Sequence, residues 1–305
     1  MAILLVGGAG YIGSHTARAL RRSGYEVLIY DNLSTGSRVL ARGFELIEGD
    51  IGDKAALRPI LARADAIIHF AAHAYVGESV ENPRKYFGNN VIGSLELLNC
   101  AVDSGIRRIV FSSSCAVYGI PKITPISEST SREPGNPYGA SKFFFENALE
   151  AYDRAYGIGS IRLRYFNAAG ADESGEIGEI HTPETHLIPL ALAATTEHGS
   201  ELQICGSDYA TADGTCVRDY IHVSDLADSQ VRALKYLERG GGSDTMNLGT
   251  GRGHSILEVI EAIENTTGPG GATKNGACAN GGPACSGSRS GPGEKCTRMV
   301  CAARP

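Results

Sequence analysis

The chain has 305 residues, 42% hydrophobic and 20% charged, enough for one large α/β domain or two smaller ones. Its formal net charge is −6 and no block of like charges stands out, which argues against a nucleic-acid surface or a polybasic membrane patch. The first apolar run, residues 2–6, is too short for a signal peptide core or a membrane span. The sequence therefore predicts a cytoplasmic protein that acts on a small molecule and binds neither nucleic acid nor membrane.

Short apolar runs alternate with longer amphipathic segments up to about residue 165, which is the pattern of a parallel sheet covered by helices on both faces. The predicted strands are residues 2–7, 25–30, 44–48, 65–70, 107–113 and 159–165. The predicted helices are residues 11–23, 53–63, 82–103 and 138–156. We therefore predict an α/β fold with a doubly wound parallel sheet of the Rossmann type, formed by a first domain of residues 1–166.

The pattern changes after residue 166. Predicted helices at 186–198, 223–238 and 255–266, with short strands near 202–205 and 245–248, indicate a smaller α/β substrate-binding lobe that occupies mainly residues 167–267. Residues 268–305 hold 9 of the 39 glycines and 4 of the 8 cysteines but no Leu, Ile, Phe or Tyr, so we predict an unstructured tail. Its cysteines form no C-x-x-C pair and have no partner histidine, so no metal site is predicted.

A glycine-rich run, GGAGYIG from Gly7 to Gly13, follows the first predicted strand and opens the first predicted helix. Glycine at Gly7, Gly10 and Gly13 permits a tight turn, close approach of a pyrophosphate and close packing of helix on strand. Asp31 ends the second predicted strand, 18 residues after Gly13. A carboxylate there accepts a hydrogen bond from a ribose 2′-hydroxyl and repels a 2′-phosphate, so the sequence predicts NAD rather than NADP.

Tyr138 and Lys142 lie four residues apart in a predicted helix and therefore share one face. A neighbouring ammonium favours the phenolate of a tyrosine, which makes Tyr138 a candidate proton acceptor. The serine run from Ser112 to Ser114 ends a predicted strand at the edge where open sheets bind ligands. We predict that Ser114 shares the substrate proton with Tyr138, although Ser112 or Ser113 are alternatives at this point. Without the glycine and serine motifs, an ordinary surface pair would be the default interpretation of Tyr138 and Lys142.

Further motifs occur in a fixed order along residues 2 to about 267. They are GGAGYIGSHT (7–16), DNLSTG (31–36), GDI (49–51), HFAA (69–72), VGESV (76–80), NNV (89–91), FSSSCAVYG (111–119), NPYGASK (136–142), LRYFNAAG (163–170), DGTCVRDYIHV (213–223) and NLGTGRG (247–253). In these motifs the chain resembles the UDP-glucose (UDP-galactose) 4-epimerases of the extended short-chain dehydrogenase/reductase family.

The resemblance implies NAD as cofactor, a UDP-sugar as substrate, a homodimer, and catalysis by Ser114, Tyr138 and Lys142. The NAD contacts that it implies are Tyr11, Ile12, Asp31, Asn32, Asp50, Ile51, Phe70, Ala71, Asn89 and Phe166. The substrate contacts that it implies are Ser114, Tyr138, Asn167, His186, Leu187 and Arg218. His186 stands where the family often has Asn, and the guanidinium of Arg218 suits a pyrophosphate.

The implied activity is 4-epimerization of a UDP-hexose through a transient 4-keto sugar, with NAD regenerated in each turnover. A 4,6-dehydratase is disfavoured, because Cys115-Ala116 stand where those enzymes have Asp-Glu. A 4-epimerase of UDP-pentoses or UDP-uronic acids remains an alternative, because the same catalytic groups would serve. An inactive NAD-binding protein is another, because residues 268–305 lack the Arg-x-Gly-Asp-like segment that clamps the pyrophosphate in the family. One hypothesis is that this tail is an out-of-frame reading of a GC-rich gene.

Overall fold

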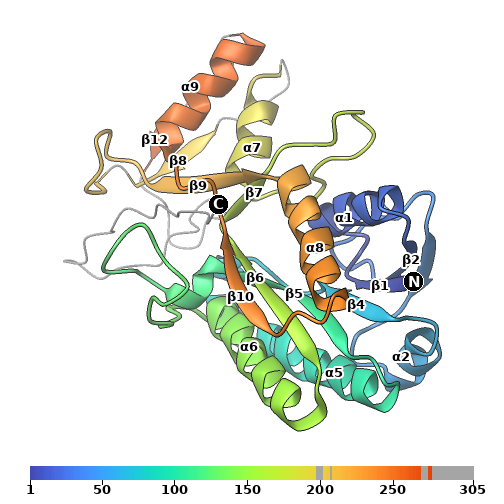
Figure 1. Cartoon of the computed structure of the whole chain (residues 1–305). Helices are drawn as coiled ribbons and strands as arrows, with labels where there is room; N and C mark the ends of the chain where they lie inside the picture. The colour runs from blue at the N-terminus through green and yellow to red at the C-terminus, as the bar shows by residue number, and fades with distance from the viewer. Residues whose placement is uncertain (197–201, 207, 269–273, 277–305) are drawn as a thin grey trace.

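The computed structural model describes residues 1–196, 202–206, 208–268 and 274–276. Seven strands form one sheet in the order β10-β6-β5-β4-β1-β2-β3, and its neighbouring strands run parallel (Figure 1). The strands are β1 (Ala2–Val6), β2 (Glu26–Asp31), β3 (Glu45–Glu48), β4 (Ala66–His69), β5 (Arg108–Ser114), β6 (Gly159–Tyr165) and β10 (Asp244–Leu248). The chain order reverses between β1 and β4, and open sheets bind ligands beyond the carboxyl ends of strands at such a point.

Helices cover both faces of this sheet (Figure 1). One face carries α1 (Tyr11–Arg22) and α8 (Val223–Glu238), and the other carries α2 (Lys54–Leu61), α5 (Ser94–Asp103) and α6 (Pro137–Tyr156). Because side chains alternate across a strand, Ile3 and Leu5 of β1 pack into the cluster with α1 and α8. Leu4 and Val6 pack into the opposite cluster. The predicted α/β fold with a doubly wound parallel sheet is confirmed.

The predicted helix 82–103 is instead three consecutive segments. They are α4 (Pro83–Tyr86), a π-helical segment (Phe87–Gly93) and α5. Helix α3 (Val76–Glu81) and a 3₁₀ turn (Cys115–Tyr118) form where no element was predicted. Segments of four to seven residues contain less than two helical turns, so hydrophobic periodicity does not reveal them.

A second group of elements lies beyond the main sheet. Strands β7 (Asn167–Ala169), β9 (Val217–His222) and β11 (Gly253–Ser255) form a three-stranded sheet in the order β11-β9-β7. Strand β8 (Gln203–Cys205) pairs with β12 (Lys274–Gly276), and helices α7 (Leu187–Ala194) and α9 (Ile256–Thr267) pack together. Strand β9 was not predicted, because its sequence VRDYIH is too polar to be recognised as a strand.

Two elements of the predicted lobe of residues 167–267 pack with the first domain. Its α8 packs on α1, and its β10 extends the main sheet by pairing with β6. A parallel sheet grows at its edge through a helical crossover, and local patterns do not show which sheet a strand joins. Of the predicted unstructured tail, Lys274–Gly276 form β12, and residues 269–273 and 277–305 lie outside the described residues. Within the described ranges, no helix is both long and apolar enough to cross a membrane.

Candidate active site

The turn between β1 and α1 fits tightly against the end of β4. Gly7 has a φ of +81°, and a Cβ there would lie 2.4 Å from the backbone nitrogen of Ala71. A Cβ on Gly13 would lie 2.6 Å from the carbonyl oxygen of Gly7. Gly10 is the N-cap of α1 and has no capping side chain, so the N–H groups of the first turn are left for a ligand. The glycine positions therefore fit a dinucleotide pyrophosphate at the start of α1.

Tyr11, in the first turn of α1, connects this turn to the second group of elements. Its hydroxyl donates to the carbonyl oxygen of Gly170 at 2.5 Å, and Ile12 beside it is half-buried. Burial raises the pKa of Tyr11, and the negative charge of Glu179 adds to the rise. The loop that contains Glu179 therefore lies close to the start of α1.

Asp31 is fixed at the carboxyl end of β2. Its carboxylate accepts hydrogen bonds from the backbone nitrogens of Ala9 at 2.9 Å and Leu33 at 2.8 Å. A Cβ on Gly36 would lie 2.8 Å from a carboxylate oxygen, so the following loop closes over the acid. Burial raises the pKa of Asp31, and the two backbone hydrogen bonds oppose that rise. The carboxylate is thus held beside the glycine turn, where the sequence predicted a ribose acceptor.

Asn32, Asp50 and Ile51 lie together after the neighbouring strands β2 and β3. The side-chain amide of Asn32 donates to Asp50 at 3.0 Å. Ile51 is buried and packs against the π-helical segment, where a Cβ on Gly93 would lie 2.6 Å from its side chain. Asn89 is in that same segment, and single-turn π segments are frequent at functional sites. The structure therefore brings these four predicted cofactor residues to one side of the sheet edge.

Phe70 and Ala71 directly follow β4 and face the glycine turn. Their backbone nitrogens both donate to the carbonyl oxygen of Val6, at 2.7 and 2.9 Å. Phe166 follows β6 and is buried with Val117 and Tyr118. Strands β4 and β6 thus deliver these predicted cofactor residues at their carboxyl ends, as an open parallel sheet requires.

Tyr138, Lys142 and Ser114 form a connected group. Tyr138 and Lys142 lie in α6, and the Lys142 ammonium donates to the carbonyl oxygen of Ser112 at 2.7 Å. The Ser114 hydroxyl lies close enough to the phenol of Tyr138 to lower its pKa. This contact supports Ser114 over its two neighbours, because Ser113 hydrogen-bonds Glu146 and Ser112 hydrogen-bonds Tyr165.

Burial shifts the pKa values of Tyr138 and Lys142 in opposite directions. It raises the pKa of Tyr138, with Tyr165 adding to the rise and the Ser114 hydroxyl opposing it. It lowers the pKa of Lys142 to about 7, against the attraction of Glu146. A tyrosine and a lysine with such shifted pKa values in one contact are typical of proton-transfer sites.

A buried ion pair that was not predicted from the sequence lies one turn beyond Lys142. Arg164 of β6 donates to both carboxylate oxygens of Glu146, at 2.8 and 2.5 Å, and to the hydroxyl of Tyr118 at 2.7 Å. Ser113 also donates to Glu146, at 2.6 Å. Two signals were present in the sequence: Glu146 continues the four-residue spacing of Tyr138 and Lys142, and Arg164 is a charge inside a buried strand. The pair joins α6 to β6, and Ser113 joins it to β5, which carries the serine run.

Asn167 and Arg218 lie in the three-stranded sheet. The side-chain amide of Asn167 in β7 donates to the carbonyl oxygen of Asp219 at 2.9 Å. Burial raises the pKa of Cys115 to about 11, and Arg218 of β9 is close enough to oppose that rise. Since Cys115 directly follows Ser114, Arg218 is near the predicted catalytic group.

His186 and Leu187 stand at the start of α7. Leu187 packs with α9, whereas His186 is half-exposed and contacts Glu179 and Glu184. Burial raises the pKa of Glu179, but the imidazoles of His181 and His186 more than reverse this and hold it at about 2. His186 is therefore part of a histidine and glutamate cluster that the sequence analysis did not identify.

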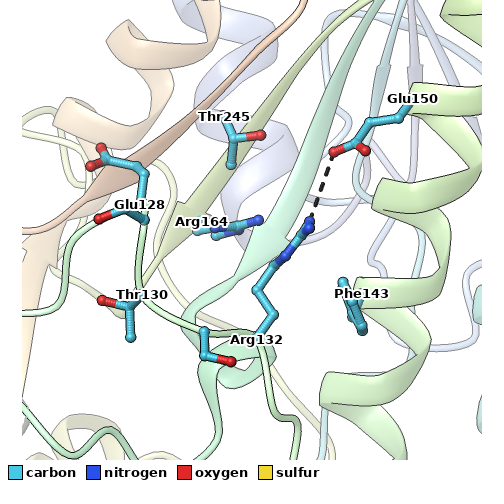
Figure 2. A pocket seen from close by; sticks show the side chains of 9 residues that line it. Glu128, Thr130, Arg132, Phe143, Glu150, Arg164 and Thr245 are labelled. Atoms are coloured by element: carbon cyan, nitrogen blue, oxygen red, sulfur yellow. Dashed lines mark ion pairs between the residues drawn. The ribbon is translucent and has the colours of Figure 1, made fainter.

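A polar cavity of about 500 Å³ lies elsewhere, between α6, β6 and the loop of residues 128–132 (Figure 2). Arg132 extends through it toward Glu150, at 3.8 Å, and Arg164 forms part of its wall. No residue that the sequence analysis predicted for cofactor, substrate or catalysis lines this cavity. The residues predicted for cofactor, substrate and catalysis therefore lie away from this cavity.

Comparison with known proteins identifies the family. The profile of the NAD dependent epimerase/dehydratase family matches residues 3–249. This chain belongs to that family. It is 52% identical to a UDP-glucose 4-epimerase of Rhizobium leguminosarum bv. trifolii over 267 residues, which are 87% of this chain and 82% of that protein. It is 53% identical to a UDP-glucose 4-epimerase of Rhizobium meliloti (strain 1021) over 264 residues, 86% of this chain and 80% of that one.

Solved structures agree with this family membership. The UDP-glucose 4-epimerase from Brucella ovis in complex with NAD is 45% identical with a TM-score of 0.91, covering 99% of this chain and 90% of that one. The UDP-glucose 4-epimerase from Bifidobacterium longum in complex with NAD⁺ and UDP is 35% identical with a TM-score of 0.85, covering 100% of this chain and 90% of that one. The residues at the sheet edge of this chain fit the dinucleotide on which the family depends.

Proposed function

We propose that this protein interconverts UDP-glucose and UDP-galactose by NAD-dependent epimerization at C4, through a transient 4-keto sugar. The observation that carries the proposal is the position of Lys142, whose ammonium donates to the Ser112 carbonyl at the end of β5 and lies 5.9 Å from the centre of the Tyr138 ring. The same sheet edge carries the glycine turn and Asp31, and the most similar relatives given above are UDP-glucose 4-epimerases.

Side chains of this protein carry out the proton transfer. The phenolate of Tyr138 accepts the proton of the sugar 4-hydroxyl, and the neighbouring Ser114 hydroxyl shares that proton. The positive charge of Lys142 stabilises the phenolate. When bound, NAD supplies the acceptor for the C4 hydride and then the donor that returns it to the opposite face of the ring. Tyr138 gives the proton back to the 4-keto oxygen as the hydride returns to C4, which forms the new 4-hydroxyl and leaves the site ready for another turnover.

We assign the dinucleotide to the glycine turn and the residues around it. Gly7, Gly10 and Gly13 take the pyrophosphate, and the fixed carboxylate of Asp31 takes the adenosine ribose. The other proposed contacts are Tyr11, Ile12, Asn32, Asp50, Ile51, Phe70, Ala71, Asn89 and Phe166. The sheet edge where these residues gather supports this assignment.

We assign the UDP-sugar to the three-stranded sheet and the start of α7. Arg218 supplies positive charge for the diphosphate, and its proximity to Cys115 supports a sugar placed beside Ser114. Asn167, His186 and Leu187 complete the proposed substrate contacts. This assignment makes residues 167–267 mainly the substrate lobe, apart from α8 and β10, which join the main sheet.

We also propose a homodimer formed through α5, α6 and the adjoining π-helical segment. Ile92 in that segment is 62% exposed and Phe144 in α6 is 51% exposed, and these two elements contact each other. Large apolar side chains on adjacent elements are typical of a protein interface. Light scattering of the purified protein tests the dimer, and Phe144→Glu should shift it to monomers.

We also propose a cytoplasmic location, because Cys100, Cys115 and Cys216 are free thiols.

A panel of UDP-sugars tests the proposed substrate. The purified protein with NAD⁺ is given UDP-galactose, a UDP-pentose or a UDP-uronic acid, and products are followed by NMR. We expect kcat/KM to be largest for UDP-galactose among the three UDP-sugars. A larger value with the pentose or the uronic acid identifies that alternative instead. Bound NAD with no conversion of any of them identifies an inactive NAD-binding protein.

A further inference from the structure

Four side chains with metal-binding atoms converge in the loop that precedes α7. They are Glu179, His181, Glu184 and His186, and their ligand atoms all lie within 4.8 Å of one another. The order is E-x-H-x-x-E-x-H, so one short segment supplies all four groups. None of them belongs to the Ser114, Tyr138 and Lys142 group, although His186 is also one of the proposed substrate contacts. From the sequence, only the cysteines of residues 268–305 were considered as metal ligands.

The separations match those of a four-coordinate ion. The Nδ1 atom of His181 lies 3.3 Å from Glu179 and 3.5 Å from Glu184. The Nδ1 atom of His186 lies 2.9 Å from each of the same two carboxylates. Nitrogen and oxygen ligands at roughly 2.0–2.1 Å around a tetrahedral ion are about 3.3 Å apart. The four contacts, at 2.9 to 3.5 Å, are close to this edge length, and all four ligand atoms lie within 4.8 Å of one another.

An unsatisfied nitrogen points to an ion at the centre of these four groups. Nδ1 of His181 is buried and has no hydrogen-bond partner among the described residues, because its approach to the carboxylates is outside hydrogen-bond geometry. A buried polar atom without a partner is costly. A metal ion between the four groups would take the lone pair of this nitrogen.

The surroundings hold the ligands in place. A carboxylate oxygen of Glu184 accepts hydrogen bonds from the backbone nitrogens of Thr185 at 2.7 Å and His186 at 2.8 Å. The ring of Tyr75 contacts both imidazoles, with centroids 6.3 and 6.2 Å away, and its hydroxyl donates to Pro183 at 3.3 Å. Metal ligands with such outer contacts are already oriented before the ion arrives.

We propose that Glu179, His181, Glu184 and His186 bind one divalent transition-metal ion, with Zn²⁺ preferred, through two Nδ1 atoms and two carboxylates. The two carboxylates balance the charge of the dication. Imidazole nitrogen favours Zn²⁺ over Mg²⁺ and Ca²⁺, which take oxygen ligands. The ion closes the loop before α7 as a structural element, and this inference does not depend on the proposed epimerase activity.

Titration with Co²⁺ tests the site directly. Untagged protein is stripped of metal with a chelator, dialysed and titrated, and the visible d–d absorption of tetrahedral Co²⁺ is recorded. We expect one Co²⁺ per chain, without a sulfur charge-transfer band, and its displacement by one Zn²⁺. His181→Gln and Glu184→Gln should each weaken binding at least ~10–100-fold. His254→Gln is the matched control, because His254 has a single glutamate neighbour at 3.7 Å, and it should bind like the unaltered chain.

Three results would overturn the inference. The first is the absence of the visible band in the unaltered chain at saturating Co²⁺. The second is binding that both His181→Gln and Glu184→Gln leave unchanged. The third is a sulfur charge-transfer band that persists in both variants, since it would place the ion on cysteines. Circular dichroism of each variant checks that it is folded, and the titration of the unaltered chain remains decisive if one variant is not.

Discussion

The ammonium nitrogen of Lys142 lies 5.9 Å from the centre of the Tyr138 ring, one turn further along α6. Helical geometry produces this contact, because residues four apart share a face. Its chemical importance comes from the fold, since β5 supplies the Ser112 carbonyl that holds the ammonium and the Ser114 hydroxyl that contacts the phenol. Proton transfer therefore depends on the way α6 packs against the end of β5.

Tyr138→Phe should lower kcat by at least ~10²–10⁴-fold, because it removes the proton acceptor and keeps the ring. Bound NAD and the thermal midpoint should stay unchanged. Tyr152→Phe is the matched control, because Tyr152 lies in the same helix and donates to Asn99 at an exposed site. Steady-state rates with UDP-galactose measure the effect. Turnover of Tyr138→Phe close to that of the Tyr152→Phe control would refute the assignment.

The pH dependence of kcat/KM should follow the Tyr138 and Lys142 pair. Burial lowers the pKa of Lys142 to about 7 and raises the pKa of Tyr138, so the first proton leaves the pair near pH 7. The remaining proton can then reside on lysine beside a tyrosine phenolate, which is the active form. kcat/KM should therefore rise with pH and level off above about pH 7.

Lys142→Met tests this interpretation of the pH profile. Without the lysine, Tyr138 titrates alone, so the rising limb should move to higher pH. Lys54→Met, which alters an exposed lysine paired with Glu96, should leave the profile in place. A Lys142→Met enzyme with an unchanged rising limb would show that this lysine does not control the ionisation of Tyr138.

Asp31→Asn should shift the cofactor preference from NAD toward NADP. The substitution keeps the shape of the side chain and one acceptor oxygen, but it removes the charge that repels a 2′-phosphate. Fluorescence titration of the cofactor-free protein with NADH and NADPH gives the ratio of the two affinities. Asp53→Asn, at the N-cap of α2, should keep the original ratio. An unaltered protein that prefers NADPH would disprove the role of Asp31.

Glu146→Gln should destabilise the protein by about 3–5 kcal/mol, because it leaves the buried charge of Arg164 without its partner. Glu45→Gln breaks an exposed pair with Arg63 and should leave the unfolding midpoint unchanged. The double variant Glu146→Gln, Arg164→Met should regain part of the stability, since it removes both charges. Urea unfolding curves measure all three. Equal midpoints for Glu146→Gln and Glu45→Gln would contradict the buried pair.

The sequence predicted those parts of the molecule that depend on local patterns. Strands such as β1 are continuous apolar runs, and the glycine turn has its own spacing, so both could be recognised. The buried pair of Glu146 and Arg164 could not, because its partners lie 18 residues apart and meet only when α6 packs on β6. The return of β10 to the main sheet is a similar long-range event. Roles at Asn167, His186 and Arg218 came from resemblance, since single polar residues carry no pattern.

The central claim is that C4 of the sugar is oxidised and then reduced again within one site. UDP-galactose with deuterium at C4 tests this most directly, with NAD⁺ present and NMR detection of the product. We expect UDP-glucose that keeps its deuterium at C4, with no net reduction of NAD⁺. Failure to form UDP-glucose, or UDP-glucose whose C4 deuterium has exchanged for solvent hydrogen, would contradict this claim.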